Sequence, residues 1–421
     1  MKSPFFSSLN DCIDFIKSRN EKLGIRFGLE RISKTLKYLN DPHKKYKTIH
    51  IAGTNGKGST TTMIASILHA SGYKVGSFIS PKISIYNEMF LLNGHEISNE
   101  DLLQNFNEII DFCQDLTAFE ILTVLAFNFF KNENVDYAVI EVGCGGLLDS
   151  TNVIEPVATV ITNIASDHAS WLGDIVQHKL GIIKPNVPLI TAIQEEATIQ
   201  KIYSKLPQDK VFIYNKDFTS ASKKILEDRQ VVHFEDKNKN FDFEIKLLGD
   251  YQIINSALAL KTCLEVLKSK LSEDLAKKGL INAKVHYRFE KISLRGKTFI
   301  LDAAHNLAGI NVLKTSLEKY FGEKTKTVVI GILHDKDYPN ILDCLIGKED
   351  SVIVTRPCSE RACDPKVLFN LLKCENKIIE DNYERAIDKA LKKDNELIII
   401  TGTFYNDDVP RKYLNKLKTT F

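Results

Sequence analysis

The sequence lacks the features of several large protein classes. Its eight cysteines include no C-x-x-C pair and do not form the short framework typical of secreted disulfide-rich domains. The 56 basic and 54 acidic residues nearly cancel, and no long run of one sign marks a nucleic-acid or membrane surface. Residues 1–10 hold no basic segment followed by an apolar one, and nowhere do about 18 uncharged apolar residues run together. These absences predict a soluble, cytoplasmic protein with reduced thiols, which binds neither nucleic acid nor a membrane.

A glycine-rich segment is the strongest local signal that is present. Residues 53–59 hold three glycines, Lys57 and Ser59, directly after a strand-like run at 48–52 and before a helical pattern at 60–70. Glycines let several backbone N–H groups converge on phosphate oxygens, and the helix N-terminus adds a favourable dipole. The spacing differs from the common G-x-x-x-x-G-K-[ST] loop, because a glycine separates Lys57 from Ser59. A plain strand-to-helix turn would need neither of these two side chains, so the segment predicts a phosphate-binding loop.

The rest of the chain predicts an α/β fold in two parts. Its 421 residues are enough for more than one core, and no internal repeat is evident. Uninterrupted apolar strands are typical of parallel sheets that are covered on both faces. We expect an N-terminal P-loop ATPase domain with a mainly parallel sheet over residues 1–286 and a smaller, Rossmann-like α/β domain over 287–421. Short strand-like runs at 211–214 and 230–234 indicate either a β-rich subdomain or an addition to the sheet edge.

The expected elements follow the apolar periodicity. In the first part, strands are expected at 48–52, 74–79, 137–140 and 157–161, and helices at 60–70, 101–113, 121–130 and 252–267. In the second part, strands are expected at 298–301, 327–330, 351–355 and 397–400.

The segment from Ala52 to Ser59 resembles the loop of the Mur-type ligases, particularly their folylpolyglutamate synthase/dihydrofolate synthase branch. The run Glu-Val-Gly-x-Gly-Gly-x-Leu-Asp-x-Thr-Asn at 141–152 is specific to that folate branch. The resemblance extends over nearly the whole chain, through matching segments at 28–31, 80–81, 119–123, 167–168, 179–182, 288–290, 302–306 and 334–337.

This resemblance implies an ATP site and a domain cleft. The residues implied for the nucleotide are Asn55, Gly56, Lys57, Gly58, Ser59, Asn255, Arg288, Asp302 and His305. Considered alone, Asn255 would be a helix cap and Arg288 an interdomain salt bridge. A guanidinium also suits bidentate phosphate binding, which favours the family role for Arg288.

Metal ligands are implied at the edge of the predicted sheet. Glu141 ends an apolar strand, so its carboxylate should project where ligands bind in open α/β sheets, although it could also cap the following turn. The family match implies Ser80, Glu141 and His168 as ligands of one Mg²⁺, although a histidine is an atypical ligand for this hard cation. It also implies that Lys179 is carbamylated and serves a second Mg²⁺; otherwise Lys179 would be a solvated helix lysine.

The implied reaction is ATP-dependent ligation of L-glutamate to a folate or dihydropteroate carboxylate through an acyl phosphate. Its catalytic residues would be Lys57, Glu141, His168 and Lys179. The pterin-containing substrate would meet Thr117, Ala118, Phe119, Glu120, Leu148, Asp149 and Ser150. In their simpler roles, Phe119 would be a core aromatic residue and Asp149 a helix cap. A monomer is expected, as in the family.

The sequence departs from the family at Lys82, Leu147, His178 and Leu307. Leu147 has the largest consequence, because it replaces an arginine that could hold an anionic substrate or the acyl phosphate. Lys82 is a candidate to supply the missing charge. Two other hypotheses stay open: a Mur-type ligase that uses a different carboxylate, and a nucleotide-binding homologue without activity. Retention of the six residues Lys57, Glu141, His168, Lys179, Arg288 and Asp302 argues against the second.

Overall fold

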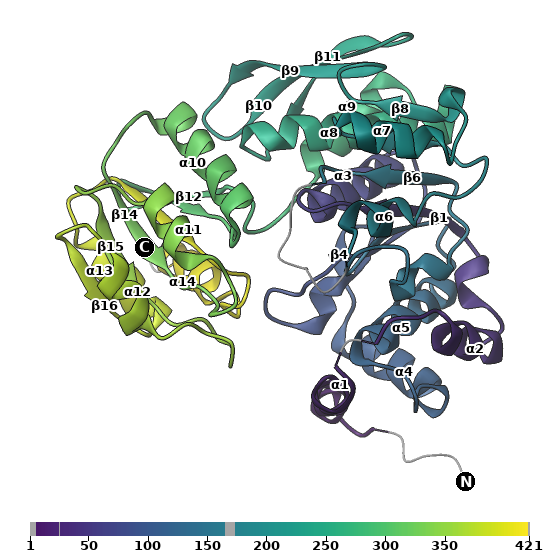
Figure 1. The fold of residues 1–421 in the computed structure, drawn as a ribbon, viewed down its shortest axis with the longest axis horizontal. Coiled ribbons are helices and arrows are strands. Elements are labelled where there is room, and N and C mark those ends of the chain that lie inside the picture. The colour runs from purple at the N-terminus through teal and green to yellow at the C-terminus, as the bar shows by residue number, and fades with distance from the viewer. Residues whose placement is uncertain (1–5, 25, 165–172, 420–421) are drawn as a thin grey trace.

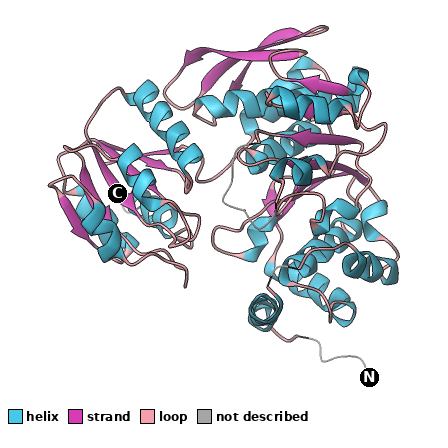
Figure 2. Ribbon diagram, in the orientation of Figure 1, coloured by secondary structure: helices cyan, strands magenta, loops and turns pink. Residues whose placement is uncertain are grey.

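The computed structural model describes residues 6–24, 26–164 and 173–419. Figure 1 shows a larger N-terminal domain beside a smaller C-terminal domain, which lies at the left of the view. Helices flank the strands in both domains (Figure 2). The predicted two-part α/β fold is therefore confirmed.

An eight-stranded sheet forms the centre of the larger domain, in the order β4-β3-β2-β5-β1-β6-β7-β8. The strands from β2 to β8 in this order pair in parallel, and the short β3 and β4 add an antiparallel edge. Every residue of β5 is buried, as expected for a strand covered on both faces. The bounds are β1 Lys47–Ala52, β2 Val75–Phe78, β3 Phe90–Leu92, β4 His95–Glu96, β5 Tyr137–Glu141, β6 Ala158–Ile161, β7 Leu189–Thr191 and β8 Val211–Ile213.

Helices cover both faces of this sheet. One core includes apolar side chains of α3, α8 and α9, and a second includes those of α1, α2, α4 and α5. Helix α3 starts at Lys57, three residues before the predicted start, so the end of the glycine segment forms its first turn. The bounds are α1 Leu9–Leu23, α2 Glu30–Tyr38, α3 Lys57–Ala70, α4 Asn99–Ile109, α5 Ala118–Asn132, α6 Ile175–Leu180, α7 Glu196–Tyr203, α8 Asp250–Leu267 and α9 Glu273–Asn282.

The region after α7 contains both of the alternatives that the sequence left open. Strand β8 extends the edge of the large sheet. The run at 230–234 lies in a separate antiparallel sheet of β9 (Phe218–Ile225), β10 (Gln230–Asp236) and β11 (Asn240–Ile245), at the top of Figure 1. Alternate residues of β10, such as Val232 and Phe234, are buried in the core that α8 and α9 share.

The C-terminal domain has a six-stranded sheet in the order β12-β13-β17-β14-β15-β16. Only β12 runs antiparallel to its neighbour in this sheet. The strands are β12 Glu290–Leu294, β13 Lys297–Leu301, β14 Lys326–Ile330, β15 Ser351–Val354, β16 Lys377–Ile379 and β17 Leu397–Thr401. The helices are α10 Leu307–Phe321, α11 Tyr338–Leu345, α12 Pro365–Leu371, α13 Tyr383–Leu391 and α14 Val409–Thr419.

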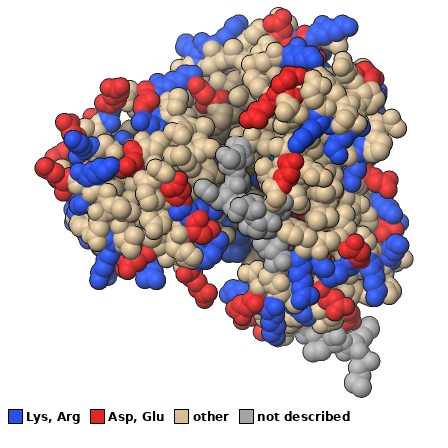
Figure 3. All heavy atoms as spheres, in the orientation of Figure 1, with Lys and Arg blue, Asp and Glu red and all other residues tan. Residues whose placement is uncertain are grey.

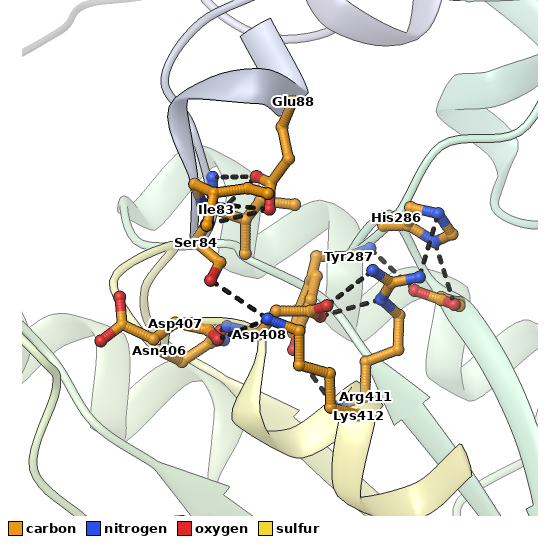
Figure 4. Close-up of polar contacts among 12 residues, drawn as sticks. Ile83, Ser84, Glu88, His286, Tyr287, Asn406, Asp407, Asp408, Arg411 and Lys412 are labelled. Atoms are coloured by element: carbon orange, nitrogen blue, oxygen red, sulfur yellow. Dashed lines mark hydrogen bonds and ion pairs between the residues drawn. The ribbon is translucent and has the colours of Figure 1, made fainter. Parts of the chain in front are cut away.

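A loop of the larger domain docks on the C-terminal domain. Glu88 accepts backbone N–H groups from Ile83 at 2.7 Å and from Ser84 at 3.1 Å, which holds the loop in a tight turn. Figure 4 shows this turn facing α14, where the Lys412 ammonium donates to the Ser84 hydroxyl at 3.2 Å. Ile83 packs against the apolar core of the C-terminal domain. The loop that follows Ser80 is thus fastened to the second domain.

The surface is mixed in charge. On the face that Figure 3 shows, basic and acidic side chains are interspersed. Within the described ranges, no helix combines the length and the apolar character that a membrane span needs.

Candidate active site

A cavity of about 500 Å³ lies between the two domains, at the carboxyl ends of β1 and β5. All the residues predicted for the nucleotide line it: Asn55, Gly56, Lys57, Gly58, Ser59, Asn255, Arg288, Asp302 and His305. The predicted metal ligands Ser80 and Glu141 line it as well. Segments from distant parts of the sequence are therefore brought to one place.

The glycine segment forms the turn between β1 and α3. Gly56 has φ +90°, and a β-carbon there would lie 2.4 Å from the Asn255 side-chain oxygen, so only glycine fits. Lys57 opens α3, and its ammonium lies 3.3 Å from the carbonyl oxygens of Gly53 and Thr54. The free N–H groups at the start of α3 and this ammonium together favour phosphate.

Asn255 closes the cavity from α8. This helix begins at Asp250, so Asn255 lies within it and the expectation of a helix cap is wrong. Its amide donates to the Gln252 oxygen at 3.1 Å, and the Gln252 amide donates to the Ser59 hydroxyl at 3.3 Å. The chain of contacts ties α8 to the phosphate loop.

Glu141 is a buried carboxylate at the end of β5. Its Oε2 accepts the Ser80 N–H at 3.2 Å, and its Oε1 lies 3.9 Å from the Lys57 ammonium. The first of these contacts joins Glu141 to the loop that begins at Ser80. Burial raises the pKa of Glu141 to about 7, although Lys57 and the Ser80 N–H oppose that rise. The Glu141 carboxylate and the hydroxyl-bearing Ser80 line the same cavity, and such oxygen donors suit Mg²⁺.

Lys179 lies behind the phosphate loop. It is on α6 with only 3% of its surface exposed, so the expectation of a solvated lysine is wrong. Its ammonium donates to the Gly53 carbonyl at 2.8 Å. His168 lies outside the described residues.

The residues predicted for the pterin substrate form a second group, beside the glycine turn after β5. Thr117 and Glu120 make a capping box at the start of α5, and Glu120 also pairs with Arg31 at 3.0 Å. The half-buried Phe119 ring packs so closely on Gly143 that a β-carbon there would lie 2.3 Å from it.

Asp149 caps the short 3₁₀-helix Ser150–Val153, so the helix cap expected as its alternative role is present. The hydroxyl groups of Thr123 and Ser150 lie 2.7 Å apart and join this turn to α5. Ala118, Leu148 and the other residues of this group do not line the interdomain cavity.

The C-terminal domain contributes cations to the cavity wall: Arg288, which the resemblance assigned to ATP, and Lys336 and Arg361, which had no assigned role. The Arg288 guanidinium lies 4.5 Å from the Phe404 ring centroid. Lys336 and Arg361 line the same wall of the cavity, and both lie beside Asp335, at 3.5 and 3.4 Å. Lys336 lies within 334–337, one of the segments that match the family. Arg361 follows β15 in a turn whose sequence showed no motif.

Asp302 follows β13 and is held by backbone groups. It accepts the N–H groups of Phe289 and Ala304, both at 2.8 Å, and the Tyr251 hydroxyl of α8 at 3.3 Å. Burial raises the pKa of Asp302, and Arg288 opposes the rise. This carboxylate fixes the second domain's edge against α8.

Known proteins are similar to this chain in sequence and fold. The Mur ligase middle domain family matches residues 51–263, and the Mur ligase glutamate ligase domain family matches residues 287–404. The dihydrofolate synthase/folylpolyglutamate synthase of Bacillus subtilis is 31% identical over 95% of this chain and 97% of its own.

Two solved structures have the same fold. E. coli FolC in complex with DHPP and ADP is 27% identical with a TM-score of 0.86, over 98% of this chain and 99% of its own. A bifunctional folylpolyglutamate synthase/dihydrofolate synthase with Mn, AMPPNP and L-glutamate is 25% identical with a TM-score of 0.84, over 100% of each chain. The chain belongs to the Mur ligases, and within them to the folylpolyglutamate synthase/dihydrofolate synthase family.

Proposed function

We propose that the protein is an ATP-dependent ligase that joins L-glutamate to a dihydropteroate or folate carboxylate, as a dihydrofolate synthase, a folylpolyglutamate synthase or both. The observation that carries the proposal is the interdomain cavity, where Lys57 and Glu141 face Arg288 of the second domain. The ligands of the two solved relatives, DHPP with ADP and AMPPNP with L-glutamate, support the substrate classes.

The reaction has two steps. Transfer of the γ-phosphoryl group to the substrate carboxylate gives an acyl phosphate and ADP. The amino group of glutamate then attacks the acyl carbon, phosphate leaves, and the amide forms with release of a proton. Lys57 offsets charge on the phosphoryl oxygens, and the two domains exclude water that would hydrolyse the acyl phosphate.

The nucleotide is expected to span the two domains. The Asn255 side chain lies against Gly56 of the glycine loop, which supports its proposed contact with adenine. Arg288 would contact the phosphates, while Asp302 and His305 would face the nucleotide from the second domain.

Mg²⁺ is expected at Ser80, Glu141 and His168. The Glu141 carboxylate and the Ser80 hydroxyl are suitable donors, and a buried carboxylate with a raised pKa gains from a neighbouring cation. When bound, the ion would neutralise charge on the ATP phosphates.

A carbamylated Lys179 with a second Mg²⁺ is the finer form of this proposal. The buried ammonium lies 2.8 Å from Gly53 of the phosphate loop, where a carbamate would place a carboxylate close to the metal region. Protein prepared without CO₂ should regain activity on addition of bicarbonate. A Lys179→Arg variant is the control and should not respond, and an equal response in both proteins would contradict the carbamate.

The glutamate and the pterin substrate are expected at opposite ends of the site. Lys336 and Arg361 are candidates for the glutamate carboxylates, because both cations line the second-domain wall. The pterin substrate is assigned to residues 117–120 and 148–150, where Phe119 offers a half-buried ring for stacking.

The test is ADP release that depends on both ATP and L-glutamate, measured with dihydropteroate and then with tetrahydrofolate. Release with either substrate supports the proposal and says which activity is present. Nucleotide binding without release in either case would favour a different carboxylate substrate or an inactive homologue. A monomeric state and a cytoplasmic location stay predictions.

A further inference from the structure

A buried histidine connects the strand before the phosphate loop to the turn after β5. His50 lies on β1, three residues before Gly53, and its side chain has no exposed surface. Its neighbours Ile49 and Ile51 belong to the core on the α3 and α8 face, so His50 points to the opposite face of the sheet. There its Nε2 lies 2.9 Å from the Thr151 hydroxyl oxygen.

The proton positions in this contact follow from the partners. The Thr151 hydroxyl lies 2.5 Å from Asp149 Oδ1, and a carboxylate only accepts, so the hydroxyl donates to Asp149. The His50 ring must then donate its Nε2–H to Thr151. The other tautomer would bury an Nδ1–H group, and Nδ1 has no partner among the described residues. Burial lowers the pKa of His50 to about 3, so the ring is neutral.

Asp149 also accepts hydrogen bonds from the backbone of the glycine turn after β5. Its second oxygen accepts the Cys144 N–H at 2.8 Å, and its first also accepts the Thr151 N–H at 3.0 Å. The carboxylate thereby closes the segment 144–151 into one frame. Asn152 braces the same segment, because its amide donates to the Leu147 carbonyl at 2.9 Å.

We propose that His50 is a positioning residue: through Thr151 and Asp149 it fixes the 144–151 turn at a set distance from the phosphate loop. The inference rests on the proposed function in one respect, namely that this turn carries the pterin-containing substrate. The relay of His50, Thr151 and Asp149 does not line the nucleotide cavity. Its loss should therefore displace the substrate carboxylate while leaving ATP binding intact.

The first test compares Michaelis constants in four variants. His50→Leu and Thr151→Val remove the relay, while His50→Gln keeps a donor near the Nε2 position and Thr151→Ser keeps the hydroxyl. The two removals should raise the KM for the pterin-containing substrate about tenfold, the scale of one lost hydrogen bond, with the KM for ATP changed less than about twofold. His50→Gln and Thr151→Ser should recover most of the loss. An equal rise in both KM values, or no recovery, would overturn the inference.

The second test needs no activity. Hydrogen exchange of peptides that cover 144–151 should quicken in His50→Leu and Thr151→Val, while exchange in α3 stays unchanged. Thr262→Val is the matched control: it removes an equally buried hydroxyl, bonded to the Leu258 carbonyl at 2.7 Å on α8. It should leave the turn unaffected.

Unchanged exchange in the turn of the relay variants would overturn the inference whatever the enzyme's substrate. Failure of the wild type to release ADP would instead count against the proposed function.

Discussion

Two buried histidines should make the larger domain less stable to unfolding in mild acid. Burial lowers the pKa of His50 to about 3 and that of His43 to about 4, from an ordinary value of 6.5. His43 packs beside the Phe127 ring, and its Nδ1 is buried without a partner among the described residues. Because both folded-state pKa values are depressed, the unfolded chain binds more protons below pH 6.5. Stability is then lost progressively as the pH falls towards 4 and 3.

The size of this loss at pH 5 depends on the unfolded-state pKa alone, because both folded rings are still neutral there. One and a half pH units below 6.5, at about 1.36 kcal/mol per unit, each histidine costs about 2 kcal/mol relative to neutral pH. Glu141 acts in the opposite direction, since its pKa is raised to about 7 and its folded form gains a proton. A comparison of wild type with a histidine variant cancels this opposing contribution, because both proteins keep Glu141.

The assay is urea unfolding of wild type, His50→Gln and His43→Gln at pH 7 and pH 5, followed by circular dichroism. Between the two pH values, each variant should lose about 2 kcal/mol less unfolding free energy than the wild type. His95→Gln is the control, because His95 lies exposed on β4, and it should follow the wild type. If His50→Gln loses as much as the wild type, the ring is protonated or hydrated in the folded protein and the reasoning fails.

Three further predictions concern the cavity and the domain contact. Lys57→Ala should lower ADP release at least about 100-fold, because a cation at the transferred group is lost, and retention of a tenth of the activity would contradict its role. Arg361→Ala should raise the KM for L-glutamate about tenfold with the KM for ATP unchanged, and an equal rise in both would contradict the assignment. Ile83→Asp should quicken hydrogen exchange in α14, where the loop docks, whereas Ile225→Asp, at an exposed position on β9, should not. Equal effects in these two variants would refute the docking role.

The phosphate loop was predictable because its signals are local. A buried strand, glycines and a helix start stand next to each other in the sequence, and Lys57 and Ser59 fall within one turn. The burial of Lys179 was harder to predict, because a lysine on a short helix usually points into water. Only the packing of α6 against the loop buries its ammonium on Gly53. The cap expected at Asn255 was wrong because the helix expected at 252–267 already contained this residue, and α8 begins earlier still, at Asp250.

The contacts that the sequence could not reveal join distant segments. His50 and Thr151 are 101 positions apart in the sequence. The residues next to them do not indicate that the two side chains form a hydrogen bond. Arg361 reaches the cavity only because β15 lies beside β14 in the second sheet and both strands end at the same edge. Such residues become visible as a group once topology places the strand ends together.

The arginine that Leu147 replaces is not restored by Lys82. The Lys82 ammonium donates to the Ser84 carbonyl at 2.7 Å and lies over the Tyr86 ring, so it is engaged within its own loop. Two other cations, Lys57 and Arg288, oppose the rise that burial causes in the pKa of Glu141, so both lie within electrostatic reach of its carboxylate. Charge on an acyl phosphate formed beside Glu141 would therefore be met from both domains. Arg288 belongs to the second domain, so this compensation would be complete only while the two domains are in contact.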